Sequence, residues 1–366
     1  MSASVRAPLQ DPAEFRLRNM IGEGEEDAIG ARLHGIKARE VLQAALNAAG
    51  WDRPKPGPNH GRGIALFGRL IGGGAAGAVM TAEPEGTIAV LIPTIDQGVG
   101  THTIVQQLVA EDMGLPLERV RVVVGDTDTA PYDDGPRASR VTYTEGLAVL
   151  KACGELRARL AEHAAQLLDC REEDVAYRDG AFSGEGRRVS LGATAAAADA
   201  GRPVAVTVRE DAPLIEDVSY FCAQVAEVEV DPETGQVRVD RLVTAHDVGT
   251  IINPVTHQGQ IDGGVATGIG LALTEELVQA EGHITNAHLG DYKLPTIADM
   301  PPLDTVLVAS AGGTGPHGAK AIGEFSNNPP PAAIANAVAD AVGARLFELP
   351  ITAERVYQAL NGAQPR

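Results

Sequence analysis

The chain contains the glycine-rich stretch Gly312-Gly313-Thr314-Gly315-Pro316-His317-Gly318-Ala319-Lys320-Ala321-Ile322-Gly323-Glu324-Phe325. It continues as Ser326-Asn327-Asn328-Pro329-Pro330-Pro331 and then as a run of helix-forming residues from Ala332 to Val342. Glycines let a backbone adopt positive φ and pass close to a ligand, and proline can open the first turn of a helix. The pattern predicts that Glu324 lies just before a helix N-terminus, on a loop that can press against a ligand. A solvated loop carboxylate is the alternative interpretation.

The composition bounds the class of protein. A chain of 366 residues is longer than a usual single domain, so we expect two or more packed units. The net charge of −19 argues against nucleic acid and anionic membranes as partners. An anionic cofactor would therefore have to be held largely by backbone N–H groups.

The cysteines and the apolar runs exclude further classes. Cys153, Cys170 and Cys222 are widely spaced and predict no disulfide framework, iron–sulfur cluster or zinc site. No apolar run approaches the length of a membrane span, and Met1 to Ala13 lacks the apolar region of a signal peptide. We expect a cytoplasmic protein.

Three regions follow one another along the chain. Residues 1–58 form a helical lead-in and linker, in which Asp11-Pro12 starts a helix and Pro54-Lys55-Pro56-Gly57-Pro58 is the linker. Residues 59–210 and 211–366 form two further regions. Within them, Val79–Gly98 and residues 219–248 each read as a strand, an acidic-Pro-Glu turn, a second strand and an Asp-x-Gly step that leads to a helix. The match between the two is loose, and it raises the hypothesis of an old duplication.

Further segments have the composition of a close-packed site. Asp96-Gln97-Gly98-Val99-Gly100-Thr101 opens a helix, whose first N–H groups can receive an anion, although an ordinary strand-to-helix turn also explains it. Ala138-Ser139-Arg140-Val141 opens a long helix that ends near Cys170. Asn253-Pro254 starts a helix that carries Gln260 and several glycines, which predict close helix packing or close ligand approach.

Several other chemistries are not indicated. There is no Ser-His-Asp arrangement and no phosphate-binding P-loop, and Gly98-Val99-Gly100 lacks the third glycine of a dinucleotide-binding turn. The histidines are scattered, and we interpret them as hydrogen-bonded or surface residues rather than metal ligands. They are His102, His257, His283, His288 and His317.

Four motifs in order resemble the molybdenum hydroxylases, the xanthine dehydrogenase and aldehyde oxidase family. They are the Asp96–Thr103 loop, Gly125-Asp126-Thr127 with Ser139-Arg140-Val141-Thr142, Asp247-Val248-Gly249 with Asn253-Pro254 and Gly259-Gln260, and the Gly318–Glu324 loop. Together they run over most of residues 11–360. The resemblance implies a mixed α+β fold, with sheets built of β-hairpins and packed with helices, as in the second molybdopterin-binding domain of that family.

The resemblance also implies roles for particular residues. Glu324 resembles the general base beside the molybdenum, and Gln260 resembles the amide that hydrogen-bonds the molybdenum–pterin unit. The loop Gln97-Gly98-Val99-Gly100 and the segment Ala138-Ser139-Arg140-Val141 resemble the backbone that cradles the cofactor, although Ser139 and Arg140 could equally be a helix cap and a surface salt-bridge partner. The protein itself supplies no metal ligand, because the pterin dithiolene holds the molybdenum.

One departure from the family pattern affects the expected contacts. Val99 stands where the family usually has glutamine, so one side-chain amide is lost or replaced. Gln97, two positions earlier, could compensate if the loop is shifted. The effect on the cofactor contacts stays open.

The resemblance further implies cofactors and partners. The cofactor is molybdopterin with molybdenum, in the cytosine dinucleotide form. The 2Fe-2S clusters and FAD belong to partner subunits, alongside a larger molybdopterin-binding subunit, and a dimer of such heteromers is an option. The chain resembles the C-terminal part of the molybdopterin-binding subunit, encoded as a separate smaller subunit.

The implied activity is hydroxylation of an N-heterocycle (purine- or nicotinate-like) or an aldehyde with water-derived oxygen, in complex with partners. Carbon monoxide dehydrogenase-type or reductive chemistry is an alternative within the family. A non-catalytic scaffold or assembly subunit is an alternative of another class, against which the retention of Gln260 and Glu324 argues.

Overall fold

The computed structural model describes residues 11–28, 30–198, 203–214, 220–310 and 312–362. The helices are α1 (Pro12–Arg18), α2 (Ala38–Ala49), α3 (Thr101–Asp112), α4 (Val141–Leu168), α5 (Leu191–Ala198), α6 (Pro254–Leu273), α7 (Pro329–Val342) and α8 (Ala353–Leu360). The strands are β1 (His60–Arg69), β2 (Gly74–Ala82), β3 (Ile88–Ile92), β4 (Val120–Val124), β5 (Ala176–Arg178), β6 (Ala181–Gly184), β7 (Arg187–Ser190), β8 (Val204–Ala212), β9 (Tyr220–Val230), β10 (Val237–Val248), β11 (Gln279–Ala280), β12 (His283–Ile284) and β13 (Leu303–Ala309). The expected α+β fold is confirmed.

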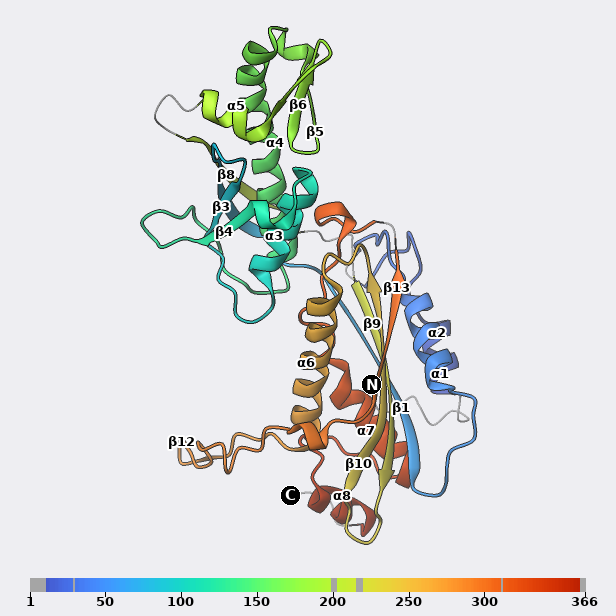
Figure 1. The fold of residues 1–366 in the computed structure, drawn as a ribbon. Coiled ribbons are helices and arrows are strands. Elements are labelled where there is room, and N and C mark those ends of the chain that lie inside the picture. Colours follow the sequence, from blue (N-terminus) through green and yellow to red (C-terminus); the bar gives the residue numbers. More distant parts are fainter. Residues whose placement is uncertain (1–10, 29, 199–202, 215–219, 311, 363–366) are drawn as a thin grey trace.

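Two four-stranded sheets in the described residues share one topology (Figure 1). In the first, β2 and β3 form an antiparallel hairpin, α3 follows, and β4 returns parallel to β3 before α4 begins. In the second, β9 and β10 form the hairpin, α6 follows, and β13 returns parallel to β10 before α7 begins. The loose internal repeat seen in the sequence therefore corresponds to a repeated arrangement of strands and helices.

The two sheets exchange their remaining strands. β1 precedes the first hairpin in the chain but pairs antiparallel with β9 of the second sheet. β8 precedes the second hairpin but pairs antiparallel with β2 of the first sheet. Each unit thus contributes one edge strand to the other, and the backbone hydrogen bonds of these strands connect the two units.

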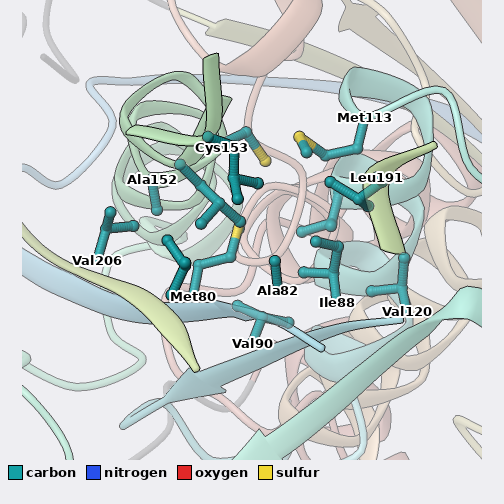
Figure 2. Close-up of a cluster of buried hydrophobic side chains, with 14 of the residues drawn as sticks. Met80, Ala82, Ile88, Val90, Met113, Val120, Ala152, Cys153, Leu191 and Val206 are labelled. Carbon is teal, nitrogen blue, oxygen red and sulfur yellow. The ribbon is translucent and has the colours of Figure 1, made fainter. Parts of the chain in front are cut away.

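Equivalent helices cover equivalent strands. α4 packs on β2 and β8, and α7 packs on β1 and β9. The core under α4 is almost wholly apolar, with Met80, Ile88 and Val90 of the sheet facing Ala152 and Cys153 of the helix (Figure 2). Burial of such side chains stabilises each unit by about 1.5–3 kcal/mol per large residue.

The lead-in helices lie on the second sheet. α2 packs on β9, β10 and β13, on the face opposite α7 (Figure 1). Its buried side chains are Val41, Leu42, Ala45 and Leu46, which meet the inner residues of that sheet. The expected helix start at Asp11 is confirmed, since its carboxylate accepts hydrogen bonds from Ala13 N–H at 2.8 Å and Glu14 N–H at 3.0 Å.

The glycines of α6 serve close packing, as predicted. A side chain on Gly264 would meet Ser326 Oγ at 1.9 Å, and one on Gly268 would meet the ring of Pro330 at 2.5 Å. The segment that follows Glu324 can therefore lie directly on α6. α7 begins at Pro329, so the prolines form its first turn ahead of the predicted helical run from Ala332 to Val342.

A thin arm projects from the body between α6 and β13. It carries the short pair β11 and β12 (Figure 1). Within the described residues, no helix is both long enough and apolar enough to cross a membrane.

Candidate functional site

A cavity of about 200 Å³ lies where four loops meet. One loop follows β3, one precedes α4, one leads from β10 into α6, and one precedes α7. The lining residues are Gln97, Val99, Thr101, Ile104, Pro136, Arg137, Ser139, Arg140, Val141, Thr142, Thr250, Ile252, Asn253, Thr256, His257, Gln260, Ala319, Lys320, Ala321, Ile322, Gly323 and Glu324. The two repeated units therefore contribute matching loops to one site.

The loop after β3 is folded around Asp96. The Asp96 carboxylate accepts hydrogen bonds from the N–H groups of Gly98 at 2.9 Å and Gly100 at 3.1 Å. Burial alone would raise the pKa of Asp96, but these backbone donors outweigh it and hold that pKa below its usual value. Gly98 and Gly100 have φ of 97° and 85°, which favours glycine. The turn presents Gln97 and Val99 to the cavity, whereas the two glycines do not line it.

The segment before α4 is fixed by the side chain of Arg140. This guanidinium is 1% exposed and donates to the carbonyls of Gly73 at 3.0 Å, Gly135 at 2.8 Å and Ala75 at 2.6 Å. It also lies 3.5 Å from Asp133. The interpretation of Arg140 as a surface salt-bridge partner is therefore wrong. Its guanidinium donates hydrogen bonds to buried acceptors, and these bonds tie the segment to β2.

Ser139 connects this segment to the Glu324 loop. Ala138 and Ser139 both have positive φ, at 52° and 54°, and Ala138 does not line the cavity. The unusual backbone turns Ser139 Oγ toward the second unit, where it accepts a hydrogen bond from Glu324 N–H at 2.9 Å. Ser139 is thus a link between the two units and not a cap of α4.

Glu324 lies at the edge of the cavity with both backbone groups bonded. Its N–H donates to Ser139, and its carbonyl accepts from Asn328 Nδ2 at 2.9 Å. Its side chain is 38% exposed and forms an ion pair with Arg69, the last residue of β1. The Glu324 side chain is therefore partly exposed at the edge of the cavity while its backbone is held.

Gln260 lies beside Glu324 on the first turns of α6. A Cβ placed on Gly323 would be 3.4 Å from Gln260 Oε1 and 3.4 Å from Ser139 Oγ, so the amide, the hydroxyl and the glycine are neighbours. Gln260 backbone carbonyl accepts from Ser326 Oγ at 3.2 Å. Among the described residues, its side-chain amide makes no hydrogen bond, and it remains available to a ligand.

A buried ion pair anchors the Glu324 loop. Lys320 Nζ lies 2.9 Å from both carboxylate oxygens of Asp247, with both side chains at 0% exposure. Lys320 also donates to the Gly35 carbonyl at 2.7 Å, and Ser310 Oγ donates to Asp247 at 2.7 Å. Both charges are thus paired and hydrogen-bonded, which a buried pair requires.

Three helix N-termini and unpaired buried atoms face the same cavity. Residues at the start of α3, α4 and α6 line it, namely Thr101, Val141 and Thr256. The start of α4 has no side-chain cap, whereas Asp96 accepts the Gly100 N–H at the start of α3 and Asn253 caps α6. Thr101 is 3% exposed, and its Oγ1 is buried without a hydrogen-bond partner in the described structure. His257 Nε2 is likewise buried and unpaired, and burial lowers the pKa of His257. The uncapped N–H groups at the start of α4, and its helix dipole, favour an anion.

A buried carboxyl supports the loop after β3. Glu145 of α4 is 1% exposed, and Thr94 Oγ1 donates to it at 2.6 Å. Burial raises the pKa of Glu145 to about 7. The pKa of Glu145 in the folded protein exceeds its pKa of about 4.5 in the unfolded chain. The contribution of protonated Glu145 to the unfolding free energy is therefore fully present below pH 4.5 and is lost as the pH rises through 7.

We therefore expect the difference in unfolding free energy between wild type and Glu145→Gln to fall by about 3 kcal/mol from pH 4.5 to pH 8. Denaturant unfolding at several pH values measures it. The matched control is Glu155→Gln, an exposed glutamate of the same helix. A pH-independent difference for Glu145→Gln would contradict the assignment.

The structure brings together most of the residues selected from the sequence. Gln97, Val99, Ser139, Arg140, Val141, Gln260 and Glu324 line one cavity, whereas Gly98, Gly100 and Ala138 shape its loops from behind. The sequence pattern does not indicate Thr101 or His257 as site residues. It does not indicate Arg69 either, because a single arginine at a strand end looks like any surface residue. For His257, the one indication in the sequence is its position close to the helix start at Asn253-Pro254.

The fold is that of a known class of protein. The structure superimposes with a TM-score of 0.85 on the quinoline 2-oxidoreductase of Pseudomonas putida 86, at 25% sequence identity over 96% of this chain and 49% of that chain. The family model described as molybdopterin cofactor-binding domain matches residues 35–301, and the chain belongs to this family.

Two relatives extend the likeness over nearly the whole chain. The Escherichia coli (strain K12) protein named "Probable hypoxanthine oxidase XdhD" is 33% identical over 97% of this chain and 38% of its own length. The xanthine dehydrogenase molybdenum-binding subunit of Escherichia coli O157:H7 is 31% identical over 96% of this chain and 50% of its own length. The chain thus spans half or less of these relatives.

Proposed function

We propose that the chain forms part of a molybdenum hydroxylase, in which it supplies one wall of the molybdopterin site and the general base. The observation that carries this proposal is the meeting of Glu324, Gln260 and three helix N-termini at one cavity. Family membership supports the cofactor, and the repeated loops support its position between the two units.

The residues of the cavity fit a phosphate-bearing pterin cofactor. The buried, unpaired hydroxyl of Thr101 needs a hydrogen-bond partner, and the uncapped N-terminus of α4 favours phosphate. Gln260 would hydrogen-bond the pterin unit. Gln97 would provide the second side-chain amide, which Val99 cannot supply. The cytosine dinucleotide form, which carries phosphates, suits this set. When bound, the cofactor supplies the oxidation–reduction chemistry.

Glu324 is the general base of the proposed reaction. A carboxylate that is partly exposed at the cavity can accept a proton at Oε1 or Oε2 from water-derived oxygen as that oxygen attacks the substrate. Ser139 and Asn328 hold its backbone, and Lys320 holds the loop before it. Fixed placement of this kind is what general-base catalysis requires.

An N-heterocycle is the preferred substrate class. The names of the matched hypoxanthine, xanthine and quinoline enzymes all specify nitrogen heterocycles. The aldehyde alternative rests on other relatives, whose name is aldehyde oxidoreductase molybdenum-binding subunit. A screen of both classes against the assembled complex distinguishes them.

The site needs further protein around it. A volume of about 200 Å³ is below the range of about 300–1,000 Å³ that is usual for cofactor-sized pockets. We propose that a larger molybdopterin-binding polypeptide supplies the remaining walls, and that iron–sulfur and FAD subunits in the cytoplasm complete the electron path. In this proposal, residues 1–58 are the tail of the first molybdenum domain, residues 59–210 are the first half of the second molybdopterin-binding domain, and residues 211–366 are its second half, which carries the Glu324 loop.

The proposal predicts the metal content. Purified alone, the 366-residue chain should hold far less than stoichiometric molybdenum, whereas the complex co-purified with its partners should hold about one molybdenum and one pterin per chain. Elemental analysis and pterin release measure both. A co-purified, intact complex without molybdenum would contradict the proposed function and favour a scaffold role.

A further inference from the structure

We propose that Arg69 is a positioning residue for the base, holding the Glu324 carboxylate at the cavity. This inference rests on the proposed role of Glu324. Arg69 forms an ion pair with Glu324, and the two side chains are 34% and 38% exposed. Among the described residues, the structure gives the Glu324 carboxylate no other hydrogen-bond or ion-pair partner.

Arg69 is the last residue of β1, a strand that is held in place by its pairing with β9. β1 pairs with β9 along its whole length, and Arg69 stands opposite Tyr220. α7, the helix that begins after the Glu324 loop, packs on β1. A side chain on a paired strand under a helix is placed more precisely than one on a loop.

A second contact fixes the register between β1 and the loop. Alternate residues of a strand share one face, so Phe67 and Arg69 point to the same side. The ring of Phe67 lies 5.9 Å from that of Phe325, and Tyr220 lies 6.0 Å from the same ring, both edge to face. Phe325 is therefore held by two rings while its neighbour Glu324 meets Arg69.

The contacts other than Arg69 hold the backbone of Glu324 and the neighbouring Phe325, but they do not hold the Glu324 carboxylate. The backbone of Glu324 is bonded on both sides, by Ser139 and by Asn328, and Phe325 is buried at 1% exposure. What remains free is rotation of the Glu324 side chain, and the Arg69 guanidinium is the group that limits it. Arginine is always charged and presents a fixed planar fork, which suits this role.

The test uses the co-purified complex and the variants Arg69→Met and Arg69→Lys. We expect Arg69→Met to lower kcat by about 100-fold, with KM changed less than twofold, because a misplaced base slows the chemical step and not substrate binding. Arg69→Lys should restore part of the loss. The thermal midpoint and molybdenum content should stay at the wild-type level, because an exposed pair contributes little to stability.

A structural measurement provides a readout besides activity. In crystals of wild type, the Glu324 side chain should occupy one rotamer against Arg69, and in Arg69→Met it should move away or spread over several rotamers. Arg238→Met is the matched control, since Arg238 pairs with Glu229 and Asp240 on the same sheet outside the cavity. It should leave kcat unchanged.

The outcomes separate this inference from the proposed function. Wild-type kcat in Arg69→Met, or an unmoved Glu324 in its crystal structure, overturns the positioning role. A complex with Glu324→Gln that is as active as wild type overturns the base itself, whatever Arg69 does. If Arg69→Met does not accumulate as a folded complex, Arg69→Lys must show a lowered kcat at unchanged KM, and wild-type values there would overturn the inference.

Discussion

Glu324→Gln is expected to lower kcat by about 100- to 10,000-fold while molybdenum and pterin content stay at the wild-type level. The amide has the size of the carboxylate but cannot accept the proton. The backbone contacts of residue 324 with Ser139 and Asn328 do not involve its side chain, so the loop should keep its position. Steady-state kinetics and metal analysis on the same preparation measure the two quantities.

The matched control for this variant is Glu281→Gln on the projecting arm, an exposed glutamate away from the cavity. It should keep the activity of wild type. Loss of molybdenum together with activity in Glu324→Gln would assign Glu324 to cofactor binding instead of catalysis. Near-normal turnover would remove it as the base.

Lys320→Met is expected to lower the unfolding free energy by about 3–5 kcal/mol, because it leaves the Asp247 carboxylate buried and unpaired. Asp247→Asn should have a similar effect, since it strands the ammonium group of Lys320. The double variant should lose less than the sum of the two, because no uncompensated charge remains. Denaturant unfolding at neutral pH measures the series.

Lys55→Met is the control for a lysine–carboxylate pair in a different environment. Lys55 and Asp340 lie 2.8 Å apart, but each side chain is 40% exposed. Removing such a pair should change the stability by less than about 1 kcal/mol. Equal effects of Lys55→Met and Lys320→Met would contradict the view that the buried pair anchors the Glu324 loop.

Local features of the site could be read from the sequence because they depend on short-range chemistry. The proline run marks the start of α7, which begins at Pro329, slightly before the predicted run from Ala332, and the glycines at 98 and 100 mark a turn with positive φ. The glycines of α6 signal a close approach, which the segment from Ser326 to Pro330 makes. Each of these follows from what glycine or proline permits at a single position.

Contacts between distant residues were not predictable in this way. The exchange of β1 and β8 between the sheets depends on strand pairings across more than a hundred residues, and the hydrophobic pattern of a strand does not name its partner. The burial of Arg140 was missed for the same reason, since its acceptors belong to carbonyls of β2 and nearby loops. Thr101 could not be predicted either, because the burial of its unpaired hydroxyl depends on the packing around the cavity.

The most direct measurement is a crystal or cryo-EM structure of the co-purified complex with its cofactor. We expect the pterin cofactor to lie in the cavity between the two units, with Gln260 and Thr101 hydrogen-bonded to it and the Glu324 carboxylate facing the molybdenum. A cofactor bound elsewhere, with Glu324 directed into bulk solvent, would contradict it.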